Sequence, residues 1–187
     1  MAFDGITIAN IVKELNDTIL NGRIAKIAQP ENDELLLTIK PAKGQVRLVI
    51  SASASLPLIY LSRDNKPSPM TAPNFCMLLR KHIANGRIVG ISQPSLERII
   101  RFEIEHLDEL GDLCRKSLGK HSNIIFCNEK GMIIDSIKHV SAQMSSVREV
   151  LPGREYFIPD TMKKENPLGI PEENFTQELR SKPMPVG

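Results

Sequence analysis

The stretch Asn21–Pro30, NGRIAKIAQP, returns 64 residues later as Asn85–Pro94, NGRIVGISQP, with seven of ten positions identical. The likeness extends upstream, because Thr7–Pro30 aligns with Thr71–Pro94 without a gap and is identical at 11 of 24 positions. A repeat of this length predicts a chain built from two similar halves.

An amphipathic helix is expected before each copy of NGRI, because the apolar positions recur at helical spacing. The expected buried face comprises Ile11, Val12, Leu15 and Ile19 in the first half and Phe75, Cys76, Leu79 and Ile83 in the second. Thr7 and Thr71 are the expected N-caps. Gly22 and Gly86 are the expected left-handed residues that end the two helices.

After each Gln-Pro pair the pattern alternates with a period of two, which predicts strands joined by short turns. We therefore expect an α+β domain of two pseudo-repeated halves, each a helix followed by antiparallel strands. The expected domain covers residues 1–158, with halves at about 1–61 and 71–158 and a proline-rich linker at 62–70. Residues 159–187 are rich in proline and charge, so we expect an extended, loosely packed tail truncated from a longer protein.

Composition places the chain among ordinary globular proteins, with 41% hydrophobic and 25% charged residues. No apolar run approaches the length of a membrane span, and the N-terminus does not read as a secretory signal. Three scattered cysteines favour a reducing compartment, so the expected location is the cytoplasm. A net charge of +2 permits a local basic patch, and the scarcity of aromatics argues against a base-stacking platform.

The strongest candidate site is the adjacent pair Glu97 and Arg98 in SLERII, at the mouth of an expected strand in the second half. The pair combines a hydrogen-bond acceptor with a bidentate donor, which suits reading a base edge or gripping a nucleic-acid backbone. The alternative is an ordinary solvated pair at a strand start.

Two further segments could contact RNA. The turn Gly119–Asn123, GKHSN, gathers several donors between two apolar strands, with Lys116 shortly before it. Its residues either present these donors to an anion or close the loop through backbone hydrogen bonds. The second expected helix is basic towards its end, and its cations are either a solvated face or phosphate contacts. The candidates in these two segments are Arg80, Lys81, Arg87, Lys116, Gly119, Lys120, His121, Ser122 and Asn123.

No catalytic motif stands out: the chain has no P-loop, no HExxH and no GxSxG, and its acids are scattered. We therefore expect a binding module rather than an enzyme, with no metal and no cofactor.

Several blocks, in this order, resemble the NFACT family: the start through NGRIAKIAQP, then NFCMLLRKHIANGRI, SLERII, GKHSNII and KHVSAQMSSVREVLPG. The resemblance covers roughly residues 1–156 and is to the N-terminal domain of bacterial RqcH-type ribosome quality-control factors. Many of these carry the older label fibronectin-binding protein. It implies a fold like the N-terminal domain of formamidopyrimidine-DNA glycosylases.

The resemblance implies binding to the large ribosomal subunit that still holds a peptidyl-tRNA, and recruitment of alanyl-tRNA to tail the stalled chain with alanine. The family's tRNA-reading Asp-Arg pair falls on Glu97 and Arg98, so the acid here is one methylene longer. Lys116 and Leu118 stand where the family usually has an acid and a methionine. The alternatives are a surface adhesin that binds fibronectin, and a DNA glycosylase, whose nucleophilic N-terminal proline is replaced here by Met1-Ala2.

Overall fold

The computed structural model describes residues 4–95, 97–106, 113–119, 123–141, 143 and 149–156. They belong to the first of the two units into which the chain divides, Met1–Phe157; the expected tail lies outside the described residues. The helices among them are α1 (Gly5–Ile19) and α2 (Asn74–Ile83). The strands are β1 (Arg23–Glu31), β2 (Glu34–Lys40), β3 (Val46–Ser51), β4 (Leu58–Ser62), β5 (Arg87–Ser92), β6 (Arg101–Glu105), β7 (Leu113–Gly119), β8 (Asn123–Cys127) and β9 (Ile133–Ser136).

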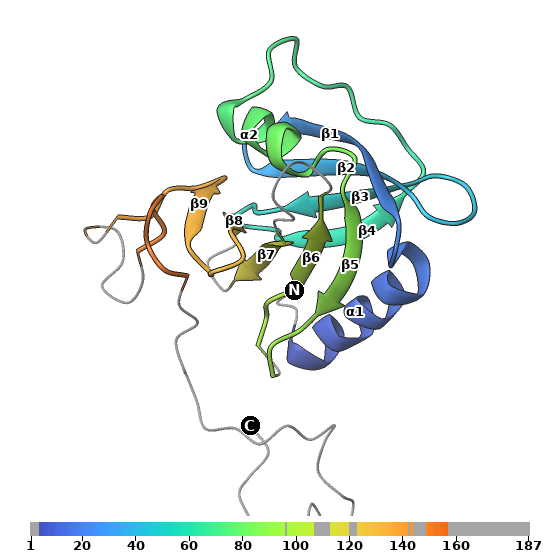
Figure 1. The fold of residues 1–187 in the computed structure, drawn as a ribbon, viewed down its shortest axis with the longest axis horizontal. Coiled ribbons are helices and arrows are strands. Elements are labelled where there is room, and N and C mark those ends of the chain that lie inside the picture. The colour runs from blue at the N-terminus through green and yellow to red at the C-terminus, as the bar shows by residue number, and fades with distance from the viewer. Residues whose placement is uncertain are drawn as a thin grey trace, which may run out of the picture. The chain divides into compact units, whose positions relative to one another are not determined.

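The strands form one antiparallel sheet in the order β4-β3-β2-β1-β5-β6-β7-β8-β9. Each half of the chain makes its own meander, and the two meanders meet where the first strand of one half lies beside the first strand of the other. We call β1–β4 the first wing and β5–β9 the second wing. The predicted α+β class with antiparallel sheet is confirmed (Figure 1).

The doubled NGRI motif forms the junction between the wings. Four backbone hydrogen bonds cross it in two equivalent pairs: Asn21 N to Ile88 O (2.7 Å) with Asn85 N to Ile24 O (2.8 Å), and Ile24 N to Gly86 O (2.8 Å) with Ile88 N to Gly22 O (3.0 Å). Each copy donates to the other at the same positions, so the motif pairs with itself. The chain therefore repeats NGRI because the two copies meet across a local pseudo-twofold axis.

The expectation that glycine supplies the left-handed residue after each helix is wrong. The residues with positive φ are Asn21 (63°) and Asn85 (66°), one position earlier than the glycines. Asparagine is among the few residues that adopt this conformation readily, because its short polar side chain hydrogen-bonds locally. In NGRI the asparagine therefore turns the chain out of the helix.

Glycine is needed at the next position because the chain is crowded there. A Cβ on Gly22 would lie 2.6 Å from Cγ2 of Ile39, and one on Gly86 would lie 2.8 Å from Cγ2 of Ile104. Both distances are shorter than carbon atoms tolerate, so a side chain would push a core isoleucine or the backbone away. The two glycines let the helix end approach the sheet.

The expected threonine N-caps are also wrong. Helix α1 is capped by Asp4, whose carboxylate accepts a 2.7 Å hydrogen bond from the backbone amide of Thr7. Aspartate satisfies a free amide of the first turn at least as well as threonine does, so it takes the position. Helix α2 follows Pro73 and has no side-chain cap, so Thr71 lies outside the helix.

The helices interlock the two wings, because α1 contacts β5 and α2 contacts β1. Equivalent residues of the two helices make equivalent bonds to the opposite half. Asn16 Nδ2 donates to Ile91 O at 2.9 Å, and Arg80 Nε donates to Ile27 O at 2.9 Å. Each half therefore satisfies a backbone carbonyl of the other.

The sheet curls, and its two wings share a core with the helices. Figure 1 shows β2–β4 behind and across β5 and β6, with α1 beside β5 and α2 beside β1. The shared core includes Leu15, Ile39, Leu48, Phe102 and Phe126. Lys138, just after β9, donates through Nζ to the carbonyl of Ala52, just after β3, so the far end of the second wing closes against the first.

Candidate nucleic-acid interface

The structures of the two copies of the repeat differ immediately after Gln-Pro. In the first wing, β1 runs through the pair to Glu31 and β2 begins at Glu34, so the turn between them is tight. In the second wing, β5 ends at Ser92 and β6 begins only at Arg101. Residues 93–100 therefore form a longer connection found in the second wing only, and it contains the predicted Glu97–Arg98 pair. Loops of this kind on a rigid sheet commonly carry recognition.

The side chain of Gln93 holds this loop in place. Its Nε2 donates to the carbonyl of Glu97 at 2.8 Å and to the carbonyl of Gly5, the first residue of α1, at 2.9 Å. Within the loop, the amide of Glu97 donates to the carbonyl of Pro94 at 3.1 Å, and Ser95 takes a left-handed φ of 49°. The loop is thus closed on itself and tied to the start of α1.

The chain after the turn anchors Arg98 at the surface. Ile99 and Ile100 are buried, with exposed fractions of 4% and 1%. Arg98, immediately before them, is exposed, and Glu97 is half-buried. The structure therefore presents the pair together from a fixed loop, and its role in reading tRNA stays a prediction.

Asp4, the N-cap of α1, precedes the Gly5 carbonyl to which Gln93 is bonded. The amide of Thr7 donates to Asp4 and lowers the pKa of its carboxyl, so Asp4 stays ionised over the physiological range. Carboxylates repel phosphates but accept hydrogen bonds from base amino groups. Because the acid Glu97 adjoins Arg98 in the chain, the pair suits contact with base edges better than simple attraction of a phosphate chain.

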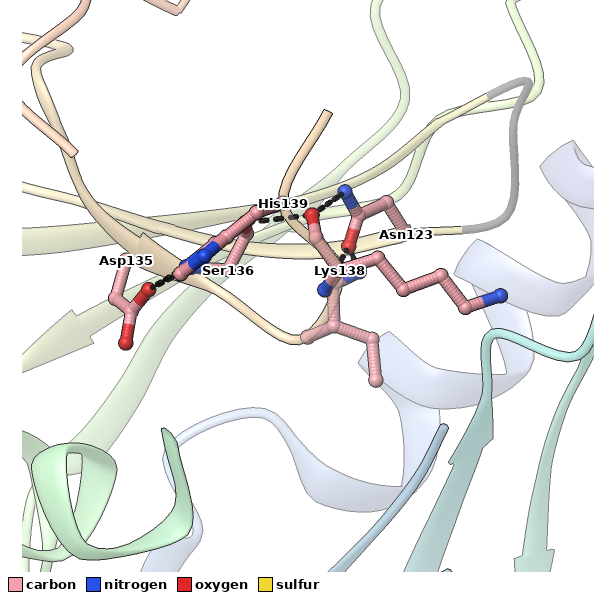
Figure 2. Close-up of polar contacts among 6 residues, drawn as sticks. Asn123, Asp135, Ser136, Lys138 and His139 are labelled. Atoms are coloured by element: carbon pink, nitrogen blue, oxygen red, sulfur yellow. Dashed lines mark hydrogen bonds and ion pairs between the residues drawn. The ribbon is translucent and has the colours of Figure 1, made fainter. Parts of the chain in front are cut away.

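Asn123, proposed from the turn GKHSN, is buried with an exposed fraction of 1%. Figure 2 shows its amide facing the turn after β9: Oδ1 accepts from the amides of Ile124 (2.9 Å) and Lys138 (3.1 Å), and Nδ2 donates to Lys138 O (2.7 Å). Ser136 Oγ donates to the same carbonyl at 2.8 Å. The Asn123 side chain therefore holds the turn after β9 rather than closing its own loop, and it is not available to an RNA.

The rest of that turn is described in part. Lys116 and Gly119 belong to strand β7, of which the structure describes the backbone path only. Lys120, His121 and Ser122 lie outside the described residues. Their contacts with RNA stay predictions.

The cations of α2 and β5 differ in how strongly the fold engages them. Arg80 uses Nε to hold Ile27 O, and Arg87 Nη2 lies 2.9 Å from Glu105 Oε2 in an ion pair whose side chains are 59% and 40% exposed. Lys81 is exposed. Arg80 is therefore first a structural residue, whereas Lys81 projects into solvent.

The sequence did not single out Gln93, which supports the loop at residues 93–98. A signal for Gln93 was present, because the Gln-Pro pair is repeated and Gln29 in the first copy also closes its turn, donating to Asn32 O at 3.1 Å. The bond from Gln93 to Gly5 joins residues 88 positions apart, which no local pattern reveals.

Within the described ranges, no group of three or more His, Cys, Asp or Glu side chains is placed to hold a metal ion. No helix in those ranges is long and apolar enough to cross a membrane.

The structure is thus an interlocked two-wing domain whose second wing carries an acid–arginine loop between β5 and β6. Its sequence matches the family model described as NFACT N-terminal and middle domains over residues 4–185. The chain belongs to the NFACT family, as the resemblance of its motifs predicted.

Named relatives come from bacteria, archaea and animals. The chain is 38% identical over 185 residues to the Rqc2 homolog RqcH of Bacillus subtilis, covering 96% of this chain and 32% of that protein. It is 22% identical over 181 residues to the human ribosome quality control complex subunit NEMF, covering 97% of this chain and 16% of that protein. The chain thus spans about a third or less of the length of these relatives.

Among solved structures, the N-terminal domain of fibronectin-binding protein PavA from Streptococcus pneumoniae superposes with a TM-score of 0.85. It is 34% identical, and the match covers 96% of this chain and 69% of that one. The likeness places the curled sheet and its two helices in a fold already seen in this family.

Proposed function

We propose that this chain is the N-terminal, RNA-contacting part of a ribosome-associated quality-control factor. In this proposal the whole factor acts in the cytoplasm, where it binds a large ribosomal subunit that still holds peptidyl-tRNA. It recruits tRNA, alanyl-tRNA in the bacterial case, for C-terminal tailing of the stalled chain. Support comes from family membership and from relatives named as Rqc2 homologues and as a ribosome quality control subunit.

The observation that carries the tRNA-reading role is the loop at residues 93–98, which the first wing lacks and which Gln93 ties to α1. A loop ordered before binding loses little entropy on contact, so its polar groups can discriminate between bases. Arg98 supplies donors and Glu97 an acceptor at adjacent positions. In this role the chain binds and orients the tRNA, while the ribosome supplies peptidyl transfer, so the factor is not itself an enzyme.

The extra methylene of Glu97 relative to the family's aspartate lengthens the reach of the acceptor by one carbon. The proposal keeps the acceptor and places its partner base slightly further from the loop backbone. The expected likeness of the fold to the N-terminal domain of formamidopyrimidine-DNA glycosylases remains part of this proposal as well.

The test is an Arg98→Ala substitution in the full-length protein that carries this domain, with co-sedimentation on large subunits and sequencing of the tRNA that travels with them. Arg63→Ala is the matched control, because Arg63 is also exposed but lies at the end of β4. We expect Arg98→Ala to lose tRNA while subunit binding and the circular dichroism spectrum persist, and Arg63→Ala to retain both. Unchanged tRNA in the Arg98→Ala pellet would contradict the assignment.

The second candidate, a fibronectin-binding adhesin, is favoured by the likeness to the structure of fibronectin-binding protein PavA. It predicts saturable binding of the purified protein to immobilised fibronectin and labelling of the protein on intact cells. Labelling absent from intact cells and present after lysis would remove it.

A further inference from the structure

Three cations stand side by side across the junction of the wings. Arg23 on β1 is paired in register with Lys40 on β2 and with Arg87 on β5. Directly paired residues of antiparallel strands project from the same face of the sheet. The residue next to each cation is a fully buried isoleucine of the shared core: Ile24, Ile39 and Ile88. The three cations therefore project from the opposite, outer face, and all three are exposed.

A second row extends this charge along the first wing. After the irregularity between Ile24 and Lys26, Lys26 pairs with Thr38, which pairs in turn with Arg47. Lys26 is exposed, and Arg47 is half-buried with Nη1 donating to the carbonyl of Arg63. We call the outer-face residues Arg23, Lys26, Lys40 and Arg87 the basic face.

The acids near the basic face lie at its edges. On β6, Glu105 pairs in register with Arg87 and forms its ion pair, and Glu103 lies opposite Gly90. At the other end of β2, Glu34 is bound by Lys66 at 2.7 Å. Within the part of the chain that the structure describes, no carboxylate forms an ion pair with Arg23, Lys26 or Lys40.

Part of this arrangement serves the fold. Arg23 Nε donates to the carbonyl of Asn85 at 3.1 Å, which covers the end of α2, and Arg87 has Glu105. The two lysines have no such bond in the described structure. Like charges directly opposite one another on a sheet are destabilising, so folding alone does not favour a lysine beside Arg23 in the row.

We propose that the basic face binds the phosphate backbone of RNA, at a site separate from the loop at residues 93–98. Neighbouring strands lie about 4.8 Å apart, so the row offers closely spaced cations to a chain of phosphates rather than to one carboxylate. The row lies at the Arg87 end of β5 and the loop follows Ser92 at the other end, about 17 Å away along the strand at about 3.3 Å per residue.

The inference rests on the proposed function for its choice of RNA, and it divides the work between two surfaces. The basic face would position any RNA, because phosphates carry no sequence information, while the loop would read bases.

The experiment compares Lys26→Ala/Lys40→Ala with the matched control Lys13→Ala/Lys130→Ala in the 187-residue chain. Lys13 is exposed on α1, which packs on the core side of the sheet, and Lys130 is exposed in the turn between β8 and β9. Both double variants remove two positive charges and, among the described residues, no side-chain hydrogen bond or ion pair. Affinity for several tRNA transcripts is measured between 50 and 200 mM salt, with circular dichroism to verify folding.

Each phosphate contact contributes about 0.7 to 0.9 to the slope of log affinity against log salt. We expect the basic-face variant to lower the slope by about 1.4 to 1.8 equally for every tRNA, so that its deficit against wild type shrinks about 7- to 12-fold across that salt range. The control should keep the wild-type slope. Glu105→Gln, which removes the acid of the row, should tighten binding.

Equal slopes for the basic-face and control variants would overturn the inference, as would the absence of tRNA binding by the folded chain. Unchanged tRNA affinity with weakened binding to phosphatidylserine vesicles would overturn it in favour of a membrane surface. Because the Arg98→Ala experiment uses ribosome co-sedimentation, it separates the two ideas. If the basic-face variant has the reduced salt slope but the full-length protein does not co-sediment with large subunits, the RNA-binding face stands and the ribosomal role is removed.

Discussion

Replacing Gln93 with alanine should disorder the loop at residues 93–98 while leaving the sheet intact. The substitution removes two side-chain hydrogen bonds, to Glu97 O and Gly5 O. At a net value of about 1 kcal/mol each, their loss amounts to about 2 kcal/mol. The equivalent change in the first wing, Gln29→Ala, removes the hydrogen bond to Asn32 O and serves as the matched control.

The loss of about 2 kcal/mol should be measurable both in the local stability of the loop and in the stability of the whole domain. Hydrogen exchange of residues 94–98 and of the first turn of α1 should rise about 30-fold in Gln93→Ala, which corresponds to about 2 kcal/mol. If the loop is coupled to global unfolding, the midpoint of thermal unfolding of Gln93→Ala should fall by about 4–8 °C, at 2–4 °C per kcal/mol for a chain of this size. Gln29→Ala should leave exchange of the loop at residues 94–98 unchanged.

tRNA affinity follows the same reasoning, because a disordered loop must be ordered on binding. We expect weaker tRNA binding by Gln93→Ala and wild-type binding by Gln29→Ala. The reasoning is refuted if Gln93→Ala leaves loop exchange at the wild-type rate, since the clamp would then not hold the loop.

The remaining predictions concern the helix ends. Gly86→Ala should destabilise the protein by about 1–3 kcal/mol through crowding against Ile104, measured by urea unfolding; a neutral result would remove the close-packing explanation. Asn85→Gly should be nearly neutral, whereas Asn85→Ala should cost about 1–2 kcal/mol in the left-handed region; equal costs would show that φ does not decide the position. The pKa of Asp4 is lowered by its bond to Thr7, so its stabilisation is present above the unfolded value of 3.8 and is lost as pH falls through the lower folded pKa. Asp4→Asn should flatten the acid limb of the stability curve in a circular dichroism titration, and an unchanged limb would contradict the cap.

Local patterns sufficed for the elements and for the presence of two halves. Apolar spacing located both helices, and alternation located the strands after each Gln-Pro pair, because these periods follow from backbone geometry within a few residues. The predictions for the helix ends were off by one to three residues, with Asp4 in place of Thr7 and Asn85 in place of Gly86. Several residue types satisfy a helix terminus, and the sequence does not rank them without the packing.

For the candidate site, the sequence singled out Glu97 and Arg98, whose role stays a prediction, and it left Asn123 open between contact with an RNA and a structural role. Only the tertiary structure buries that amide against the turn after β9. It also shows why glycine follows asparagine in NGRI, since the crowding comes from Ile39 and Ile104 on other strands.

The sequence by itself determined that this protein is made of two like halves, that each begins with an amphipathic helix, and that the halves differ after Gln-Pro. Only the tertiary structure decided that the repeated motifs pair with each other, that each helix serves the opposite wing, and that Arg23 and Arg87 share a row with Lys40. The physical reason is the distance along the chain over which each feature is determined. Periodicity is set by neighbouring residues, whereas strand register is set by contacts between segments 64 residues apart, and register alone determines which charges share a face.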